Sequence, residues 1–512
     1  MNRTHPNLRD KLGDFIKAHS LIVILILAGI LRIIYFVGIQ LADDLFYIKY
    51  VHDLLEGGFR LPMNHWETRW GLVLPVYLFS RIFGFNEYGF AVFPFICSLA
   101  NIILIYYIAE NLFKRRTGVI SAILLGVFPL DLYFSTSVYP TVPLATMCGL
   151  SVYFILRSKS LNRNFYCFWS GSFMGMAYLI HSTGLFLALF LVPYILFIVK
   201  GQKVKRFIFL SIGILIVLIA EMGAYSIIAH NPFHGMANVT KSFELNPPSV
   251  SAVQATEGVK DFNIFLKDRE AQIQRGGNFW VEPLWTLITQ QEFGIYYYFI
   301  IPLTLYFLMK RKKSEGIKVM LIWFVPVILY LFYGTVSPFE YRPLRRWPRY
   351  FSLINLPMII LLSAFLGKMF EKNKKRWAFL ILALLVSTSL IVVTIDNWHR
   401  YAHVQREVGM YMKTHDGIYF AKGTYWHLGP FVKYDSRLLK RFDEQEILKV
   451  RGQKEVYMIY SQRTKEGVNF PVIKTFETPK TIFVDLARKV GCPKIIIEKL
   501  WRREIYFIAR VS

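Results

Sequence analysis

Two adjacent carboxylates, Asp43 and Asp44, follow an apolar run over residues 21–39 that is long enough to cross a bilayer. Ionisable groups at the edge of a membrane span are costly to hold there and usually serve a function. A carboxylate in this place could take the proton from an attacking hydroxyl or amine, or hold a divalent cation. Asp at the start of a helix could instead only cap it. We predict that Asp43 is a catalytic base and that Asp44 caps a helix or holds a cation, and the reverse assignment stays open.

A second group of chemically capable residues is basic. Residues 338–350 contain four arginines between two apolar runs and end in Tyr350. A guanidinium fork matches the oxygens of a phosphate. We therefore predict phosphate contacts at Arg345, Arg346, Arg349 and Tyr350. The alternative is that these arginines pair with outer-leaflet lipid or with acids of residues 230–294.

Further polar residues interrupt the apolar runs or follow them. His181 falls in a turn at residues 175–184, where it could contact a phosphate. Arg32 could reach the interface or pair with an aspartate, Asp131 could cap a helix broken at Pro129, and Glu221 could satisfy a neighbouring helix. The candidates for a supporting role are Arg32, Arg69, Asp131 and Glu221.

The composition defines the class of protein that must position these residues. The 512 residues are 54% hydrophobic, and the formal net charge is +26. This apolar content is typical of a polytopic membrane protein. The lysines and arginines cluster between apolar runs, where they signal topology and contact anionic lipid, so nucleic acid is excluded as a partner. The four cysteines do not form a metal or disulfide pattern.

About eleven apolar runs have the length of a bilayer span. Every second connection is basic, which by the positive-inside rule places residues 1–20 in the cytoplasm and the C-terminus outside a plasma (inner) membrane. External loops then cover residues 40–87, 230–294 and 334–349. The predicted spans are residues 21–39, 88–109, 117–134, 138–156, 165–180, 184–199, 207–229, 295–309, 318–333, 350–367 and 377–395.

Two stretches of the first external loop, 44–56 and 70–83, mix apolar and polar residues in a way that predicts helices on the membrane surface. A charged stretch at 257–273 predicts another helix. Residues 21–395 form the transmembrane module, and residues 396–512 predict a small external α/β domain with strands near 456–460, 481–484 and 505–511. The chain contains no internal repeat, which argues against transporter folds built from related halves.

Several motifs in order along residues 20–370 resemble the glycosyltransferase C (GT-C) superfamily, in its protein-mannosyltransferase and aminoarabinose-transferase-like branch. They are Leu31-Arg32, Ala42-Asp43-Asp44, residues 54–58, 69–75 and 81–84, Tyr107 to Phe113, Phe128-Pro129 to Tyr139-Pro140, Gly175 to Gly184, and Pro348-Arg349-Tyr350 with Pro357. The resemblance implies a base at Asp43 or Asp44, and phosphate contacts at Arg349 and at Arg345 or Arg346. It also implies a polyprenyl-phosphate sugar donor. Residues 139–143 lack the acid that related enzymes often have there, so the resemblance supplies no second acidic metal ligand.

The resemblance and these residues together predict an inverting transfer of the sugar from a polyprenyl-phosphate donor to a lipid, polysaccharide or protein acceptor on the outer face of the membrane. The arginines would stabilise the departing phosphate and the aspartate would deprotonate the acceptor. No cofactor is required beyond a possible divalent cation at Asp43 or Asp44. The alternatives are a lipid-linked-sugar transporter or flippase, and a receptor or scaffold that only displays the C-terminal domain.

Overall fold

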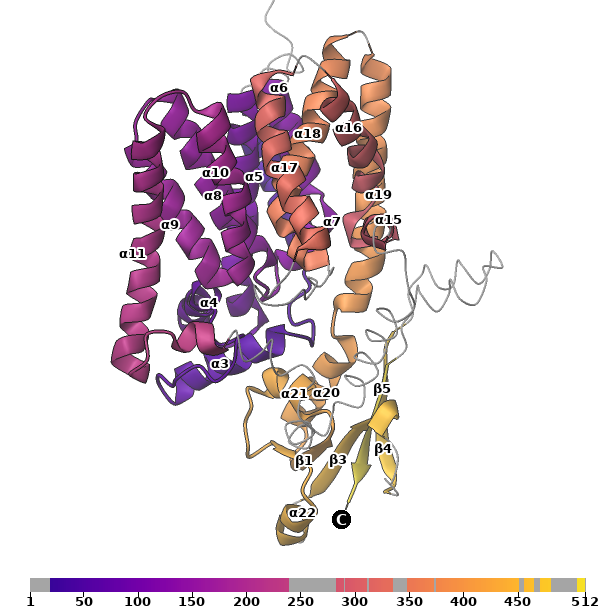
Figure 1. Cartoon of the computed structure of the whole chain (residues 1–512). Helices are drawn as coiled ribbons and strands as arrows, with labels where there is room; N and C mark the ends of the chain where they lie inside the picture. Colours follow the sequence, from indigo (N-terminus) through magenta and orange to yellow (C-terminus); the bar gives the residue numbers. More distant parts are fainter. Residues whose placement is uncertain are drawn as a thin grey trace, which may run out of the picture.

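The computed structural model describes residues 19–238, 282–289, 291–310, 313–334, 348–372, 374–450, 455–464, 470–479 and 504–511. A helical bundle forms the larger part, and a small sheet domain lies at one end of it (Figure 1). The predicted polytopic α-helical fold with a small C-terminal α/β domain is therefore confirmed. The predicted helix at 257–273, the predicted strand at 481–484, Arg345 and Arg346 lie outside the described residues.

Each predicted span contains helix. Six helices are long and apolar enough to cross a membrane in the part of the chain that the structure describes, and several shorter apolar helices accompany them. The number of true spans remains a prediction. The bundle helices are α2 (Ser20–Ile34), α5 (Glu87–Leu112), α6 (Arg115–Gly126), α7 (Pro129–Phe134), α8 (Thr141–Ser160), α9 (Phe165–Ile180), α10 (Ala188–Pro193) with its flanking turns η1 (Ser182–Leu187) and η2 (Tyr194–Ile198), α11 (Lys203–Ala229), α15 (Glu282–Thr289), α16 (Tyr296–Met309), α17 (Glu315–Tyr333), α18 (Ser352–Glu371) and α19 (Lys375–Arg400).

Local sequence explains how these helices break and pack. The third predicted span divides into α6 and α7 because Pro129 follows Phe128, whose backbone is extended (φ −63°, ψ 123°), as expected before proline. Helices α9 and α11 approach closely through glycines. A Cβ atom at Gly171 would lie 2.0 Å from the Leu210 carbonyl oxygen, and one at Gly213 would lie 2.1 Å from that of Phe168. Small residues allow such contact between membrane helices.

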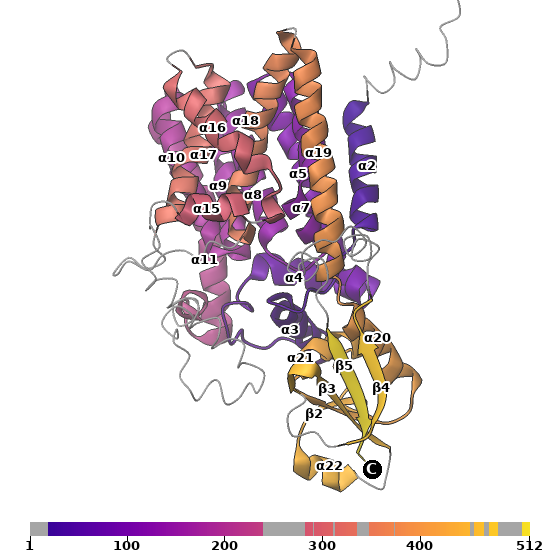
Figure 2. The same ribbon diagram turned by 90° about the vertical axis from the view of Figure 1, so that its right-hand side faces the viewer.

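Two amphipathic helices, α3 (Asp44–Glu56) and α4 (Trp70–Phe83), have the bounds that the sequence predicts. Both run across the bundle axis at one end of the bundle, as Figures 1 and 2 show together. Their buried apolar side chains form a separate small core that includes Tyr47, Tyr50 and Leu72. The two helices thereby form a platform beneath the end of the bundle where the first apolar run leads into Asp43.

The C-terminal domain is built on a five-stranded mixed sheet with strand order β2-β1-β3-β5-β4. Strand β1 pairs in parallel with β2 and β3, and β5 is antiparallel to β3 and β4. The predicted strands at 456–460 and 505–511 correspond to β3 and β5. The domain comprises α20 (His403–Thr414), β1 (Ile418–Lys422), α21 (Tyr425–Leu428), η5 (Gly429–Val432), β2 (Leu439–Arg441), α22 (Glu444–Val450), β3 (Val456–Ser461), η6 (Gln462–Thr464), β4 (Val472–Glu477) and β5 (Ile505–Arg510).

Candidate active site

A pocket opens where the platform helices meet the bundle. The side chains that line it come from segments far apart in the sequence, and five of them are predicted site residues. Around them lie Tyr139, the start of α8, and Thr183 of η1. The lining residues are Asp43, Arg69, Tyr139, Pro140, Thr141, Leu144, His181, Thr183, Arg349 and Tyr350.

Asp43 and Arg349 form an ion pair inside this pocket. The Nη2 of Arg349 lies 2.9 Å from Oδ2 of Asp43, and the two side chains are 14% and 25% exposed. Arg349 belongs to η4 (Pro348–Phe351), a single turn that precedes α18. Its guanidinium also lies 5.8 Å from the ring centre of Tyr139 and 5.5 Å from that of Tyr350. The pair is thus partly open to the pocket and held on one side by aromatic rings.

Asp44 has a different environment from its neighbour. Its side chain is fully buried, and its two carboxylate oxygens accept hydrogen bonds from the backbone N–H groups of Gln40 (2.6 Å) and Ala42 (2.7 Å). Leu41, between these two donors, has a left-handed backbone with φ of 63°. A non-glycine residue rarely adopts this conformation, and the Asp44 carboxylate stabilises it from both sides. Asp44 therefore shapes the turn that presents Asp43 and does not itself line the pocket.

Burial raises the pKa of Asp44 to about 6 and outweighs the two backbone hydrogen bonds, which act in the opposite direction. The nearby Asp43 adds to the rise. The group that holds the turn therefore titrates close to neutral pH.

Arg69 supplies the second guanidinium of the pocket. It precedes α4 directly, and its Nη1 donates a hydrogen bond to the hydroxyl of Tyr47 on α3. Burial raises the pKa of Tyr47 above its ordinary value, while the charges of Arg69 and Arg349 oppose that rise. The buried Tyr47 hydroxyl thus stays protonated and holds Arg69 at the pocket.

His181 contributes a neutral imidazole. It ends α9, and its Nδ1 accepts a hydrogen bond from the backbone N–H of Thr183 (3.2 Å) and lies 2.8 Å from the Thr183 hydroxyl. An accepting Nδ1 places the ring proton on Nε2, so the ring can donate one hydrogen bond from Nε2. Burial holds the pKa of His181 well below its usual value, and the charges of Arg69 and Arg349 lower it further.

Arg32 and Asp131 form a second ion pair, which lies inside the bundle and away from the pocket lining. Nη2 of Arg32 is 2.5 Å from Oδ2 of Asp131, and their side chains are 0% and 6% exposed. Arg32 also donates to the Ser98 hydroxyl and to the carbonyl oxygens of Ala28 and Gly126. Of the two alternatives for Arg32, the structure therefore has the pairing with an aspartate. No side-chain cap bond forms at the start of α7, and Asp131 instead binds Arg32 and Ser98.

Glu221 also lies outside the set of residues that line the pocket. Glu221 is on α11, and its carboxylate lies next to Gly235, beyond the end of that helix. A Cβ atom at Gly235 would lie 3.1 Å from Oε1 of Glu221. The sequence reasoning did not select Tyr139 or Thr183 as site residues. Two local patterns could have indicated them: Tyr139 directly precedes Pro140, and Thr183 follows His181 by two residues. Proline and threonine are common at helix starts.

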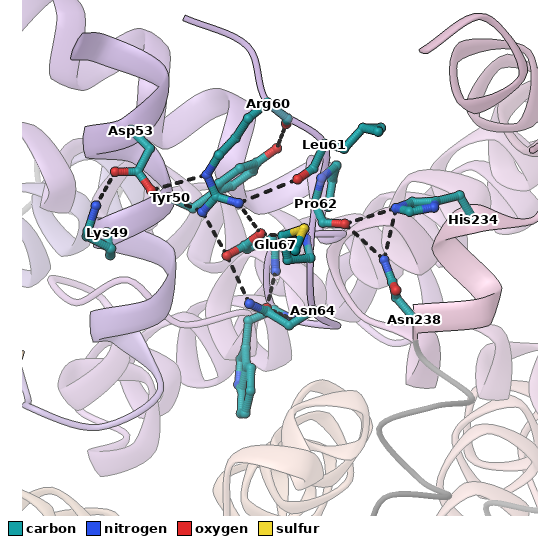
Figure 3. A network of polar contacts seen from close by, with 12 residues as sticks. Lys49, Tyr50, Asp53, Arg60, Leu61, Pro62, Asn64, Glu67, His234 and Asn238 are labelled. Atoms are coloured by element: carbon teal, nitrogen blue, oxygen red, sulfur yellow. Dashed lines mark hydrogen bonds and ion pairs between the residues drawn. The ribbon is translucent and has the colours of Figure 1, made fainter. Parts of the chain in front are cut away.

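A network of ion pairs and hydrogen bonds, shown in Figure 3, stabilises the loop between α3 and α4. Arg60 pairs with Asp53 (3.0 Å) and with Glu67 (2.9 Å), and Glu67 also accepts the backbone N–H of Met63 (2.7 Å). His234 and Asn238 contact the carbonyl oxygen of Pro62 at 2.9 and 3.1 Å. This network fixes the loop that leads directly into Arg69.

The residues that line this pocket do not suit the divalent cation that the sequence left possible. Asp43 is the single carboxylate among the described lining residues, and it is already paired with a guanidinium beside a second one. The described part of the chain also lacks a cluster of three or more His, Cys, Asp or Glu side chains that could hold a metal ion. Two guanidinium groups, one carboxylate and a neutral imidazole instead leave a positive site, which favours an anion such as a phosphate.

Comparisons with known proteins bear on the fold and on the family. Residues 75–224 match the family model described as dolichyl-phosphate-mannose-protein mannosyltransferase. An oligosaccharyltransferase of Archaeoglobus fulgidus, solved with a tethered acceptor peptide, has 12% identity and a TM-score of 0.54 over 88% of this chain and 70% of that chain. ArnT of Cupriavidus metallidurans in the apo state has 11% identity and a TM-score of 0.52 over 96% of this chain and 98% of that chain. A search of curated proteins found no match.

The chain therefore has the GT-C fold of membrane-embedded glycosyltransferases. Within that fold, the segment that matches the mannosyltransferase family model agrees with the branch that the sequence motifs resemble. The match to a mannosyltransferase family model supports the predicted glycosyltransferase over the transporter alternative.

Proposed function

We propose that this protein is an inverting glycosyltransferase that moves a sugar from a polyprenyl-phosphate donor to an acceptor at the outer face of the membrane. The observation that carries the proposal is the Asp43–Arg349 pair, which lies in a pocket with Arg69, His181 and Tyr350 at the platform end of a GT-C fold. The solved relative AglB of A. fulgidus was obtained with dolichol-phosphate, at 13% identity and a TM-score of 0.52 over 86% of this chain and 70% of that chain. A lipid-phosphate donor agrees with that relative.

Donor binding is the first step of the proposed mechanism. The donor phosphate exchanges with Asp43 as the partner of Arg349, because a phosphate offers more acceptor oxygens to the guanidinium fork than one carboxylate does. Arg69 and the Nε2–H of His181 supply further positive charge and a hydrogen bond. Arg345 and Arg346, which the sequence also predicts as phosphate contacts, remain part of the proposal.

Sugar transfer is the second step. The acceptor hydroxyl or amine attacks the anomeric carbon, its proton passes to the Asp43 carboxylate, and the bond from that carbon to the phosphate oxygen breaks. The electron pair of the broken bond leaves with the polyprenyl phosphate, whose charge Arg349 and Arg69 stabilise. A single displacement inverts the anomeric centre. Asp44 does not touch the reacting atoms in this scheme and holds the turn that presents Asp43.

The orientation completes the proposal. The basic connections between the apolar runs support a cytoplasmic N-terminus by the positive-inside rule. The pocket, the platform helices and the C-terminal domain then face the outside of the inner membrane. The acceptor is a lipid, polysaccharide or protein of the cell envelope.

Transfer by the purified protein tests this function. The full chain in lipid nanodiscs, incubated with a labelled pool of polyprenyl-phosphate sugars and an envelope extract, should move label to an acceptor. Arg349→Gln should weaken donor binding by about 10- to 100-fold, since it removes a charge-assisted hydrogen bond. Arg81→Gln is the matched control, because Arg81 lies exposed on α4 and contacts the Tyr77 hydroxyl. Transport of the labelled lipid across the bilayer of vesicles that contain the protein, without formation of product, would support the transporter instead.

A further inference from the structure

The segment that presents Asp43 is in contact with the C-terminal domain through one arginine. Arg406 lies on α20, the first helix of that domain, and its Nη2 donates a hydrogen bond to the carbonyl oxygen of Val37 at 3.0 Å. Its Nε donates to Oε2 of Glu87 at 2.8 Å, and Nη2 also pairs with Oε1 of Glu87. A single guanidinium therefore connects the domain to the end of the first span and to the start of α5.

Glu87 connects the same arginine to the next residues of the segment. Its Oε1 accepts the backbone N–H of Ile39 at 3.0 Å. Arg406 and Glu87 thus bind the backbone on both sides of Gly38, which has φ of +70°. A Cβ atom at Gly38 would lie 2.5 Å from Oε1 of Glu87 and 2.8 Å from Nη2 of Arg406. Only glycine suits this position, both because of its backbone conformation and because the two charged groups close over it.

The contacts continue from Gly38 to the pocket. The backbone N–H of Val37 donates to the Thr136 hydroxyl (3.0 Å), and the Gln40 side chain donates to the Ser137 hydroxyl (2.7 Å). The Asp44 carboxylate then binds the N–H groups of Gln40 and Ala42. The backbone of Val37, Ile39, Gln40 and Ala42 is thus hydrogen-bonded to side chains of other residues. These bonds extend along the segment up to the residue before Asp43.

The arginine itself is fixed within the domain. Its guanidinium lies 3.4 Å from the ring centre of Tyr401 and 5.8 Å from that of Phe431, and its side chain is 12% exposed. A second contact joins the C-terminal domain to α3 of the platform. The Nζ of Lys49 lies 5.3 Å from the ring centre of Tyr434, which follows η5, and the ring centre of His52 lies 5.1 Å from it. Figure 2 shows α20 on the side of the domain that faces the bundle.

We propose that Arg406 is a positioning residue for the transfer reaction, through which the C-terminal domain holds the segment of residues 37–42 and thus the Asp43 carboxylate in place. The inference rests on the proposed function of Asp43. Because Arg406 does not line the pocket, its loss leaves the donor contacts of Arg349 and Arg69 intact. Misplacement of a base by about 1 Å lowers the rate of the chemical step by about 100-fold at most, without a matching loss of binding.

Hydrogen exchange and steady-state kinetics of the full chain in nanodiscs test the proposal together. Arg406→Gln should raise amide exchange in residues 37–46 by about tenfold or more, since local opening then costs less free energy. It should lower kcat by about 10- to 100-fold while the donor KM stays within about twofold. Arg406→Lys keeps the charge but not the fork, and should recover part of kcat. Arg437→Gln is the control: Arg437 is in the same domain, exposed, and paired with Asp435.

Glu87→Gln provides an independent second variant, because it weakens the same contact from the bundle side and leaves the domain untouched. It should reproduce the exchange and kcat effects of Arg406→Gln even where the latter disturbs the packing against Tyr401 and Phe431. Unchanged exchange in residues 37–46 in both variants, or a loss confined to donor KM, would overturn the positioning role. Full turnover by Asp43→Asn would instead reject the proposed base, and the exchange result would still decide whether Arg406 holds the segment.

Discussion

Two arginine–aspartate pairs, Arg349–Asp43 and Arg32–Asp131, have the same chemistry and different surroundings. Arg349 and Asp43 meet at 2.9 Å in an open pocket between segments 306 residues apart in the sequence, and both side chains are partly exposed. Arg32 and Asp131 meet at 2.5 Å in the interior, where Ser98 and two backbone carbonyls bind the rest of the guanidinium. The guanidinium of the inner pair is enclosed by these partners, although Asp131 also lines a second hollow of similar size. The outer pair lies in a pocket together with Arg69, His181 and Tyr350.

This difference separates a structural role from a catalytic one. Removal of one partner from a buried ion pair destabilises the fold, because the remaining charge is then buried without a counter-ion or water. A pair at a pocket can exchange partners, and its aspartate can accept a proton from an incoming group. The charge of a residue is therefore a poor guide to its role, and the completeness of its contacts is a better one.

The largest expected effect concerns the outer aspartate. Asp43→Asn should reduce sugar transfer by about 100- to 10,000-fold, because an amide cannot accept the acceptor proton. Its midpoint of thermal unfolding should change little, since Asp43 is partly exposed. Transfer of labelled sugar per folded molecule is the measurement, with Asp43→Glu as the control that keeps the carboxylate. Wild-type turnover by Asp43→Asn would remove the distinction between the two pairs.

The inner aspartate should show the opposite pattern. Asp131→Asn leaves the fully buried Arg32 without a counter-ion, and should lower the free energy of unfolding by about 3–5 kcal/mol. Transfer per folded molecule should stay within a few-fold of wild type. Thermal unfolding in nanodiscs checks the first statement. Ser98→Ala is the control, because it removes two hydrogen bonds to the pair but keeps both charges, and it should cost less than Asp131→Asn. A stable but inactive Asp131→Asn protein would give Asp131 a direct role in chemistry.

A third aspartate, Asp44, sharpens the comparison through pH. Its pKa in the folded protein is raised to about 6 by burial, above the ordinary value, so the fold favours the protonated form. The stability that this group contributes is present below about pH 4 and is lost as pH rises through about 6, by about 3 kcal/mol at most. Unfolding measured from pH 4 to 8 should show this fall in wild type and not in Asp44→Asn. A fall of equal size in both proteins would assign it to another group.

The smallest effect is expected at the surface. Lys159 pairs with Glu315 at the end of the bundle away from the pocket, and Glu315 is 62% exposed. Lys159→Ala should change the free energy of unfolding by less than about 1 kcal/mol, because solvent screens an exposed pair. Thermal unfolding at low and high salt measures this. A change as large as that of Asp131→Asn would show that exposure does not separate the ion pairs of this protein.

The sequence was informative wherever the pattern is local. The mixture of apolar and polar residues at 44–56 and 70–83 predicted both platform helices with their bounds, because helical amphipathicity repeats within a few residues. The predicted residues Asp43, Arg69, His181, Arg349 and Tyr350 do come together in one pocket. Asp43, His181, Arg349 and Tyr350 lie at or next to the end of an apolar run, and Arg69 precedes a predicted surface helix, so each could be selected from local sequence.

Contacts that depend on the register between distant helices could not be predicted. Arg32 had two open alternatives until the neighbouring positions of Ser98 and Asp131 were known, since pairing requires two helices to meet at one depth. The roles of Asp43 and Asp44 are also inseparable in the sequence. They differ because Leu41 has a left-handed backbone and the Asp44 carboxylate accepts hydrogen bonds from the N–H groups on both sides of it. The local sequence does not predict this conformation.

A structure of the full chain in nanodiscs with polyprenyl phosphate measures the exchange of partners most directly. The account predicts phosphate oxygens about 2.7–2.9 Å from the Arg349 guanidinium, the distance of charge-assisted hydrogen bonds, with Asp43 released from Arg349 and facing the space above the phosphate. The Arg32–Asp131 pair should stay at its present distance. A phosphate bound elsewhere, with the Asp43–Arg349 pair intact, would contradict the central claim.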